Sequence, residues 1–167
     1  MADSLWSRIE AGELEIVRAF IRSGPPVKVG ELASALGLRV TRTPNLPSNV
    51  SGLIRPAETE SGFEVLVNKY ESQARQRFTV AHEIAHYLLH RNDIGSGVID
   101  SIMYRSSLSS RKEVEANRLA AAIVMPASAV SERLQGLGGL DEPGVVEELA
   151  EVFKVSEPAM RIRLGVG

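Results

Sequence analysis

The strongest helical patterns of apolar positions lie in the middle of the chain. From Phe78 to His90 and again from Lys112 to Met125, apolar side chains recur every three or four positions, and Pro126 ends the second run. This spacing is typical of helices with one buried face. A weaker version of the pattern covers residues 4–22, with Gly12 in its middle. We therefore expect an N-terminal helix and two longer central helices.

Three shorter stretches have the composition of strands. Residues 38–43, 50–55 and 63–69 are rich in aliphatic and β-branched side chains, and turn-forming residues separate them. A short helix over residues 29–38, closed by Gly37, precedes the first strand. The three stretches predict a small antiparallel three-stranded sheet. An edge of such a sheet can hold an extended peptide as an additional strand.

The end of the chain predicts a group of short helices. They cover residues 126–134, residues 142–153, and a last segment that Ser156 caps. Two short helices joined by a tight turn resemble a helix-turn-helix. The whole pattern predicts an α+β fold, with residues 1–126 as one domain and residues 127–167 as a helix-turn-helix-like segment packed on it.

Composition narrows the classes of protein that fit this pattern. The 167 residues are 44% hydrophobic and 24% charged, with a net charge of −2 and no cysteine. The absence of cysteine excludes disulfides, thiol catalysis and cysteine-based zinc sites. The first residues lack a secretory signal, and no run approaches the roughly 18 apolar residues of a membrane span. We expect a cytoplasmic protein that does not bind membranes.

The candidate chemistry begins with a His-Glu-x-x-His motif in the first central helix, which we expect to start between Glu71 and Arg75. Side chains four residues apart project side by side on a helix, so His82 and His86 can bind one metal ion together. Glu83 falls just beyond His86 on the helical wheel. The alternative interpretation is a helix with two solvated histidines.

Zinc is the expected ion at these histidines, and manganese could replace it. A catalytic zinc site uses three protein ligands and leaves one position for water, whose pKa falls towards about 7. Glu83 can take the proton of that water and pass it to a leaving amine. The motif therefore indicates hydrolysis of an amide bond.

The third ligand must come from outside the motif. His90 lies about 12 Å along the helix from His82, so an ion held between His82 and His86 is out of its reach. We interpret His90 as a cation near the C-terminus of a helix, where the helix dipole favours positive charge.

The second central helix supplies better candidates. Glu113 and Asn117 fall on or beside its apolar face, whereas Glu115 points the other way. A carboxylate directed into the interior needs a partner, because an isolated buried charge is too costly. Glu113 is the predicted metal ligand and Asn117 the predicted hydrogen-bond partner of a ligand. A simple helix N-terminal acid is the alternative role for Glu113, and Glu115 is the alternative ligand.

Residues 91–111 form a long polar stretch with five serines between Ser101 and Ser110. We expect it to border the cleft. Tyr104 or Arg105 could stabilise a tetrahedral oxyanion, a task that requires a donor beside the metal. An ordinary surface role is the alternative for both.

Two blocks of sequence, residues 77–90 and residues 113–126, resemble the ImmA/IrrE family of zinc metallopeptidases in their order and spacing. The chain departs mildly from the family pattern at Leu119, where a phenylalanine is usual. The resemblance implies zinc ligation by His82, His86 and Glu113 and a catalytic base at Glu83. It also implies the substrate: family members typically cut a helix-turn-helix repressor of the Xre or Cro type, which releases prophage, mobile-element or stress genes.

Two other functions are open at this point. The chain could bind a repressor or antitoxin-like partner without cutting it, or it could be a DNA-binding regulator that uses the C-terminal helices. Lys154, Arg161 and Arg163 could contact phosphates, but four glutamates in the preceding predicted helix would repel them. We therefore expect no direct DNA binding.

Overall fold

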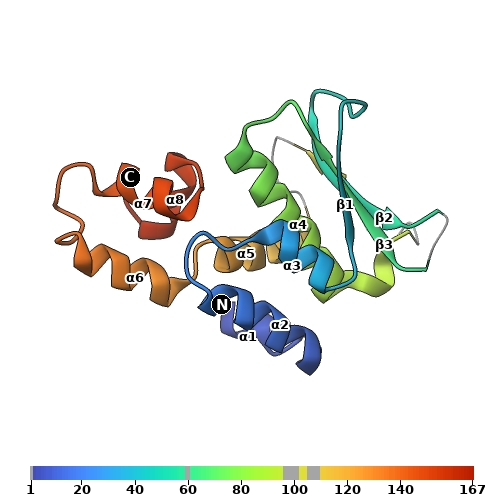
Figure 1. Ribbon diagram of the computed structural model, residues 1–167, viewed down its shortest axis with the longest axis horizontal. Coiled ribbons are helices and arrows are strands. Elements are labelled where there is room, and N and C mark those ends of the chain that lie inside the picture. The colour runs from blue at the N-terminus through green and yellow to red at the C-terminus, as the bar shows by residue number, and fades with distance from the viewer. Residues whose placement is uncertain (1, 59–60, 96–101, 105–109) are drawn as a thin grey trace.

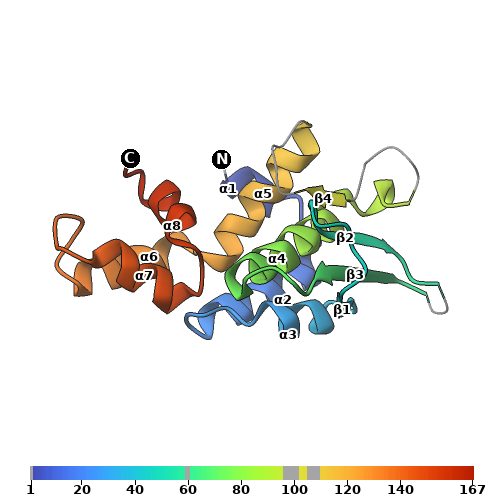
Figure 2. The same cartoon turned by 90° about the horizontal axis from the view of Figure 1, so that it is seen from above.

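Helix α4 (Gln73–His90) is the central element of the fold, and Figures 1 and 2 show it between the β-sheet and helix α5 (Arg111–Val124). The Ser72 hydroxyl begins α4 by accepting a hydrogen bond from the Arg75 backbone N–H at 3.1 Å. Ala81, Ile84 and Ala85 are fully buried on one side of the helix. The predicted helix and its apolar stripe are thus present.

The computed structural model describes residues 2–58, 61–95, 102–104 and 110–167. The remaining α-helices are α1 (Ala2–Trp6), α2 (Ala11–Arg22), α3 (Val29–Ala35), α6 (Ala127–Gly136), α7 (Val145–Phe153) and α8 (Glu157–Leu164), and a 3₁₀ helix, η1 (Arg91–Asp93), follows α4. The strands are β1 (Arg39–Thr43), β2 (Val50–Pro56), β3 (Phe63–Asn68) and β4 (Ile102–Tyr104). The α+β class is confirmed. Among the described helices, none has the length and apolarity to cross a membrane.

The sheet differs from the prediction in one strand direction and in having a fourth strand. The strands lie in the order β1-β3-β2-β4, and β1 runs parallel to β3, with Val40 opposite Val65. The three predicted strands are present, but the sheet is mixed rather than antiparallel. Val65 and Val67 of β3 are fully buried, whereas β1 is mostly exposed. Strand β3, which has no exposed residue, thus takes a central place and separates its two predecessors in the chain. The short fourth strand, β4, pairs with β2.

The contact between β2 and α4 depends on Gly52. A Cβ atom at this position would lie 2.5 Å from Thr79 Cγ2 and 2.6 Å from the Leu66 carbonyl oxygen. The backbone of β2 can approach α4 this closely only because the side chain is absent.

We expect Gly52→Ala to lower the free energy of unfolding by about 1–3 kcal/mol, because the added methyl group overpacks a closed contact. Urea denaturation measures this change. Gly30→Ala in α3 is the matched control, since its Cβ would meet nothing within 4 Å. Equal stability of the two variants would contradict the proposed overpacking.

The predicted N-terminal helix is wrong in one respect: it is two helices, α1 and α2, separated near Glu10. The Glu10 carboxylate accepts hydrogen bonds from the backbone N–H groups of Gly12 and Glu13, at 2.6 and 3.2 Å. A side chain that satisfies these donors starts a new helix. The interruption therefore comes from a cap just before Gly12.

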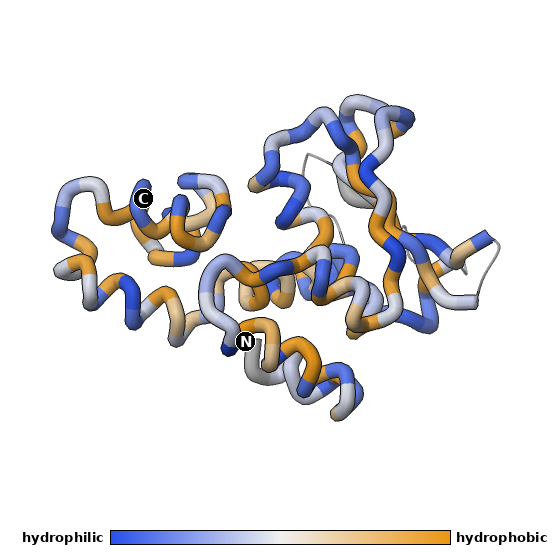
Figure 3. The backbone as a smooth tube through the Cα atoms, in the orientation of Figure 1, coloured by the Kyte–Doolittle hydropathy of each residue, from blue (hydrophilic) through white to orange (hydrophobic). Residues whose placement is uncertain are grey.

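The C-terminal segment contains the three predicted helices with shifted bounds. Helix α7 begins at Val145 rather than at residue 142, because Gly144 adopts a left-handed conformation with a φ of +78°. The predicted cap of α8 is present, with Ser156 Oγ accepting from the Ala159 N–H at 3.2 Å. Apolar residues, orange in Figure 3, continue into these helices. Phe153 and Met160 belong to the same buried core as the residues of α4.

Arg77 connects α4 to two distant parts of the chain. Its Nη1 donates to the Val27 carbonyl at 2.9 Å, Nε to the Lys154 carbonyl at 3.2 Å, and Nη2 to the Phe153 carbonyl at 3.4 Å. Burial lowers the pKa of this guanidinium. Its charge is thus held by three backbone carbonyl groups that come from both sides of α4 in the sequence.

The three cations proposed to contact phosphates, Lys154, Arg161 and Arg163, have partners within the protein. Lys154 Nζ donates to Glu151 at 2.6 Å, and Arg163 Nε donates to the Met125 carbonyl at 2.9 Å. Arg161 lies 4.0 Å from a glutamate oxygen of α7. These contacts leave little cationic surface for a phosphate backbone.

We accordingly expect no salt-dependent gel shift when micromolar protein is mixed with DNA from its own upstream region. Phosphate binding releases counterions, so a real complex would weaken steeply as the salt concentration rises. A shift with that salt dependence would support the DNA-binding alternative. A shift that does not change with salt would indicate a contact of another kind.

Candidate metal centre

The candidate site begins with two buried histidines on one face of α4. His82 is fully buried and His86 is 1% exposed, and their ring centroids lie 4.8 Å apart. The interval of four residues places the rings side by side, as one turn of helix requires. The structure therefore excludes the alternative in which these are solvated surface histidines.

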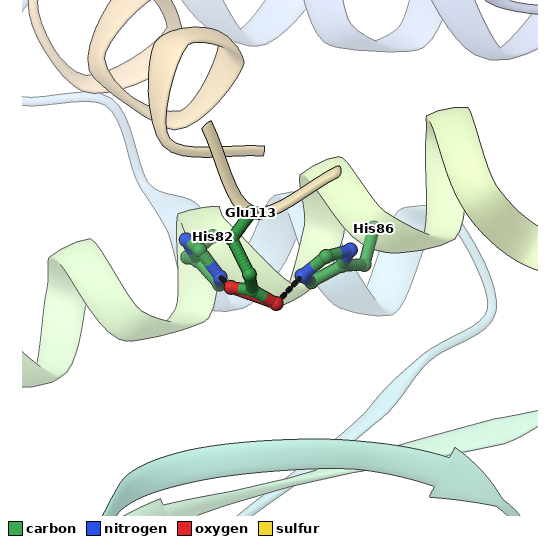
Figure 4. Close-up of side chains that lie close together, drawn as sticks. All are labelled: His82, His86 and Glu113. Carbon is green, nitrogen blue, oxygen red and sulfur yellow. Dashed lines mark hydrogen bonds and ion pairs between the residues drawn. The ribbon is translucent and has the colours of Figure 1, made fainter. Parts of the chain in front are cut away.

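Helix α5 contributes the third group from its first turn. Ser110 Oγ accepts from the Glu113 N–H at 3.2 Å and caps the helix there. Glu113 Oε2 lies 3.0 Å from His82 Nε2, and Oε1 lies 2.9 Å from His86 Nε2. Figure 4 shows the carboxylate reaching from α5 to both rings. The ligand atoms of the three residues lie within 4.8 Å of one another, so the set could hold a divalent metal ion.

Glu113 is ionised at neutral pH. Burial acts to raise the pKa of its carboxyl group, but hydrogen bonding to His82 and His86 and their charge interactions outweigh burial and lower the pKa to about 2. The pKa of His86 is also lowered, mainly because burial disfavours the imidazolium form. The site thus combines a carboxylate with at least one imidazole ring whose neutral form is favoured.

The outer nitrogens of both rings have partners of their own. His82 Nδ1 lies 3.2 Å from Asn117 Oδ1, an atom that can only accept, so His82 Nδ1–H is the donor. His86 Nδ1 lies 3.0 Å from His90 Nδ1. Asn117 therefore stands where the sequence predicted it, in contact with a ring of the histidine pair.

The hydrogen-bond partners of the two rings indicate whether their inner nitrogens can bind a metal ion. A neutral ring that carries its proton on Nδ1 has a lone pair on Nε2. His82 therefore directs such a lone pair at the ionised carboxylate of Glu113, and His86 does the same when its proton lies on Nδ1. Protonation of both rings would place two imidazolium groups side by side in a buried site, which burial and mutual repulsion oppose. A divalent cation satisfies all three groups with neutral rings, so the donor set fits a metal.

The other residues predicted to act at the site are Glu83, Tyr104 and Arg105. Glu83 follows His82 in α4, and its side chain is fully buried. Tyr104 ends the short strand β4, but its side chain lies outside the described part of the structure, as does Arg105. Their predicted role beside an oxyanion therefore stays a prediction.

Comparison with known protein families matches residues 33–165 to a peptidase family described as the IrrE N-terminal-like domain. The chain belongs to this family. The resemblance seen in the two sequence blocks is thereby confirmed, and the matched residues include every predicted ligand.

Two individual proteins show how far the similarity extends. The radiation response metalloprotease IrrE of Deinococcus radiodurans is 35% identical over 92 residues, which are 55% of this chain and 27% of IrrE. A transcriptional regulator of Mycobacterium tuberculosis has the same fold, with a TM-score of 0.60 and 20% identity over 96% of this chain and 48% of that protein. This IrrE-like chain thus matches less than half the length of either protein.

His90 ends α4, as predicted, but the sequence interpretation missed its partners. It is 4% exposed and lies between His86 and Glu115. Burial is the main cause that lowers its pKa. Its position four residues after His86 repeats the interval between His82 and His86, which was the available signal for a third ring on this face.

Glu115 does point away from the histidine pair, as predicted, and it has other partners. Its Oε2 accepts from Arg8 Nη1 at 2.9 Å, and its Oε1 lies 2.9 Å from His90 Nε2. The hydrogen bond from Arg8 is the largest cause that lowers the pKa of Glu115 to about 2. Glu115 is therefore an ionised residue of the surroundings, and the three-residue cluster forms without it.

Proposed function

We propose that this chain is a zinc-dependent endopeptidase. The observation that supports it most is the convergence of two imidazole Nε2 atoms and an ionised carboxylate, with a glutamate next to the first histidine in the same helix. Two histidines and one glutamate are the donor set of many catalytic zinc sites. The similarity to the metalloprotease IrrE supports the same reaction class.

In this proposal His82, His86 and Glu113 hold the zinc ion. The bound ion would polarise the scissile carbonyl group and lower the pKa of a water molecule towards about 7. Asn117 keeps the proton of His82 on Nδ1, which leaves Nε2 free to bind. The chain's own residues therefore set the tautomer before any substrate arrives.

Glu83 is the proposed general base. It takes a proton from the attacking water as the water oxygen bonds to the carbonyl carbon. It then delivers that proton to the nitrogen of the leaving amine as the C–N bond breaks.

The proposed substrate is a helix-turn-helix repressor of the Xre or Cro type, whose cleavage would release stress or mobile-element genes. This part of the proposal comes from the kinship with the ImmA/IrrE family, and the relative IrrE is itself a radiation response protein. A scissile peptide must enter the site in an extended form, so we expect the cut in an exposed flexible region of the repressor.

Cleavage of a purified repressor tests the proposal. The purified chain is loaded with one equivalent of zinc and mixed with a repressor encoded beside its own gene, and mass spectrometry is used to find new N-termini. We expect cleavage at one position, its loss in EDTA, and its recovery when zinc is restored. Stable binding of the repressor without any new terminus would instead support the non-cleaving alternative.

A further inference from the structure

A hydrogen-bonded row of four polar side chains runs from the candidate metal centre to the N-terminal segment. His86 Nδ1 lies 3.0 Å from His90 Nδ1, and His90 Nε2 lies 2.9 Å from Glu115 Oε1. Glu115 Oε2 accepts from Arg8 Nη1 at 2.9 Å. His86 and His90 belong to α4 and Glu115 to α5, and Arg8 follows the end of α1, which lies beside α5 (Figure 2).

The positions of the protons give this hydrogen-bonded row one direction from donor to acceptor. A neutral His86 that binds a metal through Nε2 must carry its proton on Nδ1, so it donates to His90 Nδ1. His90 then keeps its own proton on Nε2 and donates it to the Glu115 carboxylate. Glu115 receives a second bond from the guanidinium of Arg8. Each contact has one donor and one acceptor, and no member needs an additional charge.

The side chains of the hydrogen-bonded row become more exposed from His90 to Arg8. The side chain of His90 is 3% exposed, that of Glu115 13% and that of Arg8 42%. Arg8 borders two cavities of about 550 and 450 Å³; Glu115 lines the first and His90 the second. The carboxylate would be a costly partly buried charge without a cation beside it. Arg111 Nε lies 3.4 Å from Glu115 Oε2, and Arg8 supplies a second, closer cation from residues that precede the family match at residue 33.

We propose that His90 and Glu115 are positioning residues for His86, and that Arg8 ties the N-terminal segment to the candidate metal centre through them. This inference rests on the proposed zinc site. In it, the hydrogen bond from His86 to His90 fixes the orientation of the ligand ring and makes its Nε2 a better donor to the metal. The N-terminal segment thereby contributes to metal affinity without touching the ion.

Two substitutions at position 90 separate hydrogen bonding from packing. Asparagine places Oδ1 near the site of the histidine Nδ1 and can still accept from His86, whereas leucine fills similar space without an acceptor. We expect His90→Leu to weaken zinc affinity by about 10- to 100-fold, the usual loss for an outer partner of a ligand. We expect His90→Asn to recover most of that loss. Competition with a chromophoric chelator measures both affinities.

Arg8→Ala tests the outer end of the hydrogen-bonded row. We expect a smaller loss of zinc affinity, about threefold to tenfold, because the Arg8 bond acts through two intermediate groups. Arg22→Ala is the matched control, since Arg22 forms an exposed ion pair with Glu15 in the same N-terminal region and should leave the affinity unchanged. The loss caused by Arg8→Ala should disappear in the His90→Asn background, where the connection to Glu115 is already broken.

Imidazole ¹⁵N spectra of the zinc-loaded wild type give a readout that does not depend on the stability of any variant. We expect protons on His86 Nδ1 and His90 Nε2. A proton on neither His86 Nδ1 nor His90 Nε2, equal zinc affinity of wild type and His90→Leu, or equal weakness of the leucine and asparagine variants would each overturn the inference. Failure of the wild type to bind zinc would overturn the proposed function itself, and is thus a separate outcome.

Discussion

Glu83→Gln is expected to abolish cleavage of the partner protein while zinc stays bound. Glutamine has nearly the shape of glutamate, so the fold and the neighbouring ligands His82 and His86 should be preserved. Its amide cannot take a proton from water at neutral pH. Loss of a general base typically lowers the rate by about 10²- to 10⁴-fold, which would place cleavage below detection in an ordinary assay.

The experiment compares zinc content, partner binding and rate of cleavage in the same preparations. Glu148→Gln removes an exposed carboxylate from α7 and serves as the control for loss of a glutamate charge. Retained binding with lost cleavage is the result we expect for Glu83→Gln alone. Cleavage at the wild-type rate would show that another group acts as the base.

Glu113→Ala is expected to lose the metal from the protein. Glu113 is the one candidate ligand that α5 contributes to the cluster, and two imidazoles alone cannot complete a site with three protein ligands. The loss of affinity should exceed the roughly 100-fold that follows removal of an outer hydrogen-bond partner. Glu115→Ala should weaken binding less and still hold about one zinc per chain when zinc is in excess.

Elemental analysis of the two variants and the wild type, prepared identically, measures this difference. Thermal unfolding offers a second measurement, because an ion that binds only the folded protein stabilises it by about 4 kcal/mol at 1,000 times its dissociation constant. We expect added zinc to raise the unfolding midpoint of the wild type and of Glu115→Ala but not of Glu113→Ala. Zinc loss confined to Glu115→Ala would mean that the ligand assignment is wrong.

Much of the fold follows from local signals that the sequence carries plainly. Apolar spacing and a serine cap locate α4, since Ser72 satisfies a backbone donor and the following residues repeat at the period of a helix. The cap at Ser156 locates α8 in the same way. The strand order does not follow from such signals, because it depends on how the strands pair with one another. Only the assembled sheet shows that β3 lies between β1 and β2, with Val65 and Val67 buried.

The candidate site was likewise predictable only in part. The spacing of His82 and His86 and the wheel position of Glu113 were sufficient to predict that these residues meet. The environment of His90 was not predictable, because a helical wheel shows which side chains face inward but not what they meet there. Its partner Glu115 comes from another helix, and the partner of Glu115, Arg8, is 107 positions away in the chain.

The three bonds of Arg77 have a consequence for the shortest version of this protein that can fold. A fragment that ends at Pro126 would remove the carbonyl acceptors at residues 153 and 154, and a fragment trimmed to residues 33–165 would remove the one at Val27. Each lost bond to a charged donor costs about 1.5–3 kcal/mol, a large share of the stability of a small protein. Neither the family boundary nor the end of the predicted peptidase part is therefore a safe place to cut.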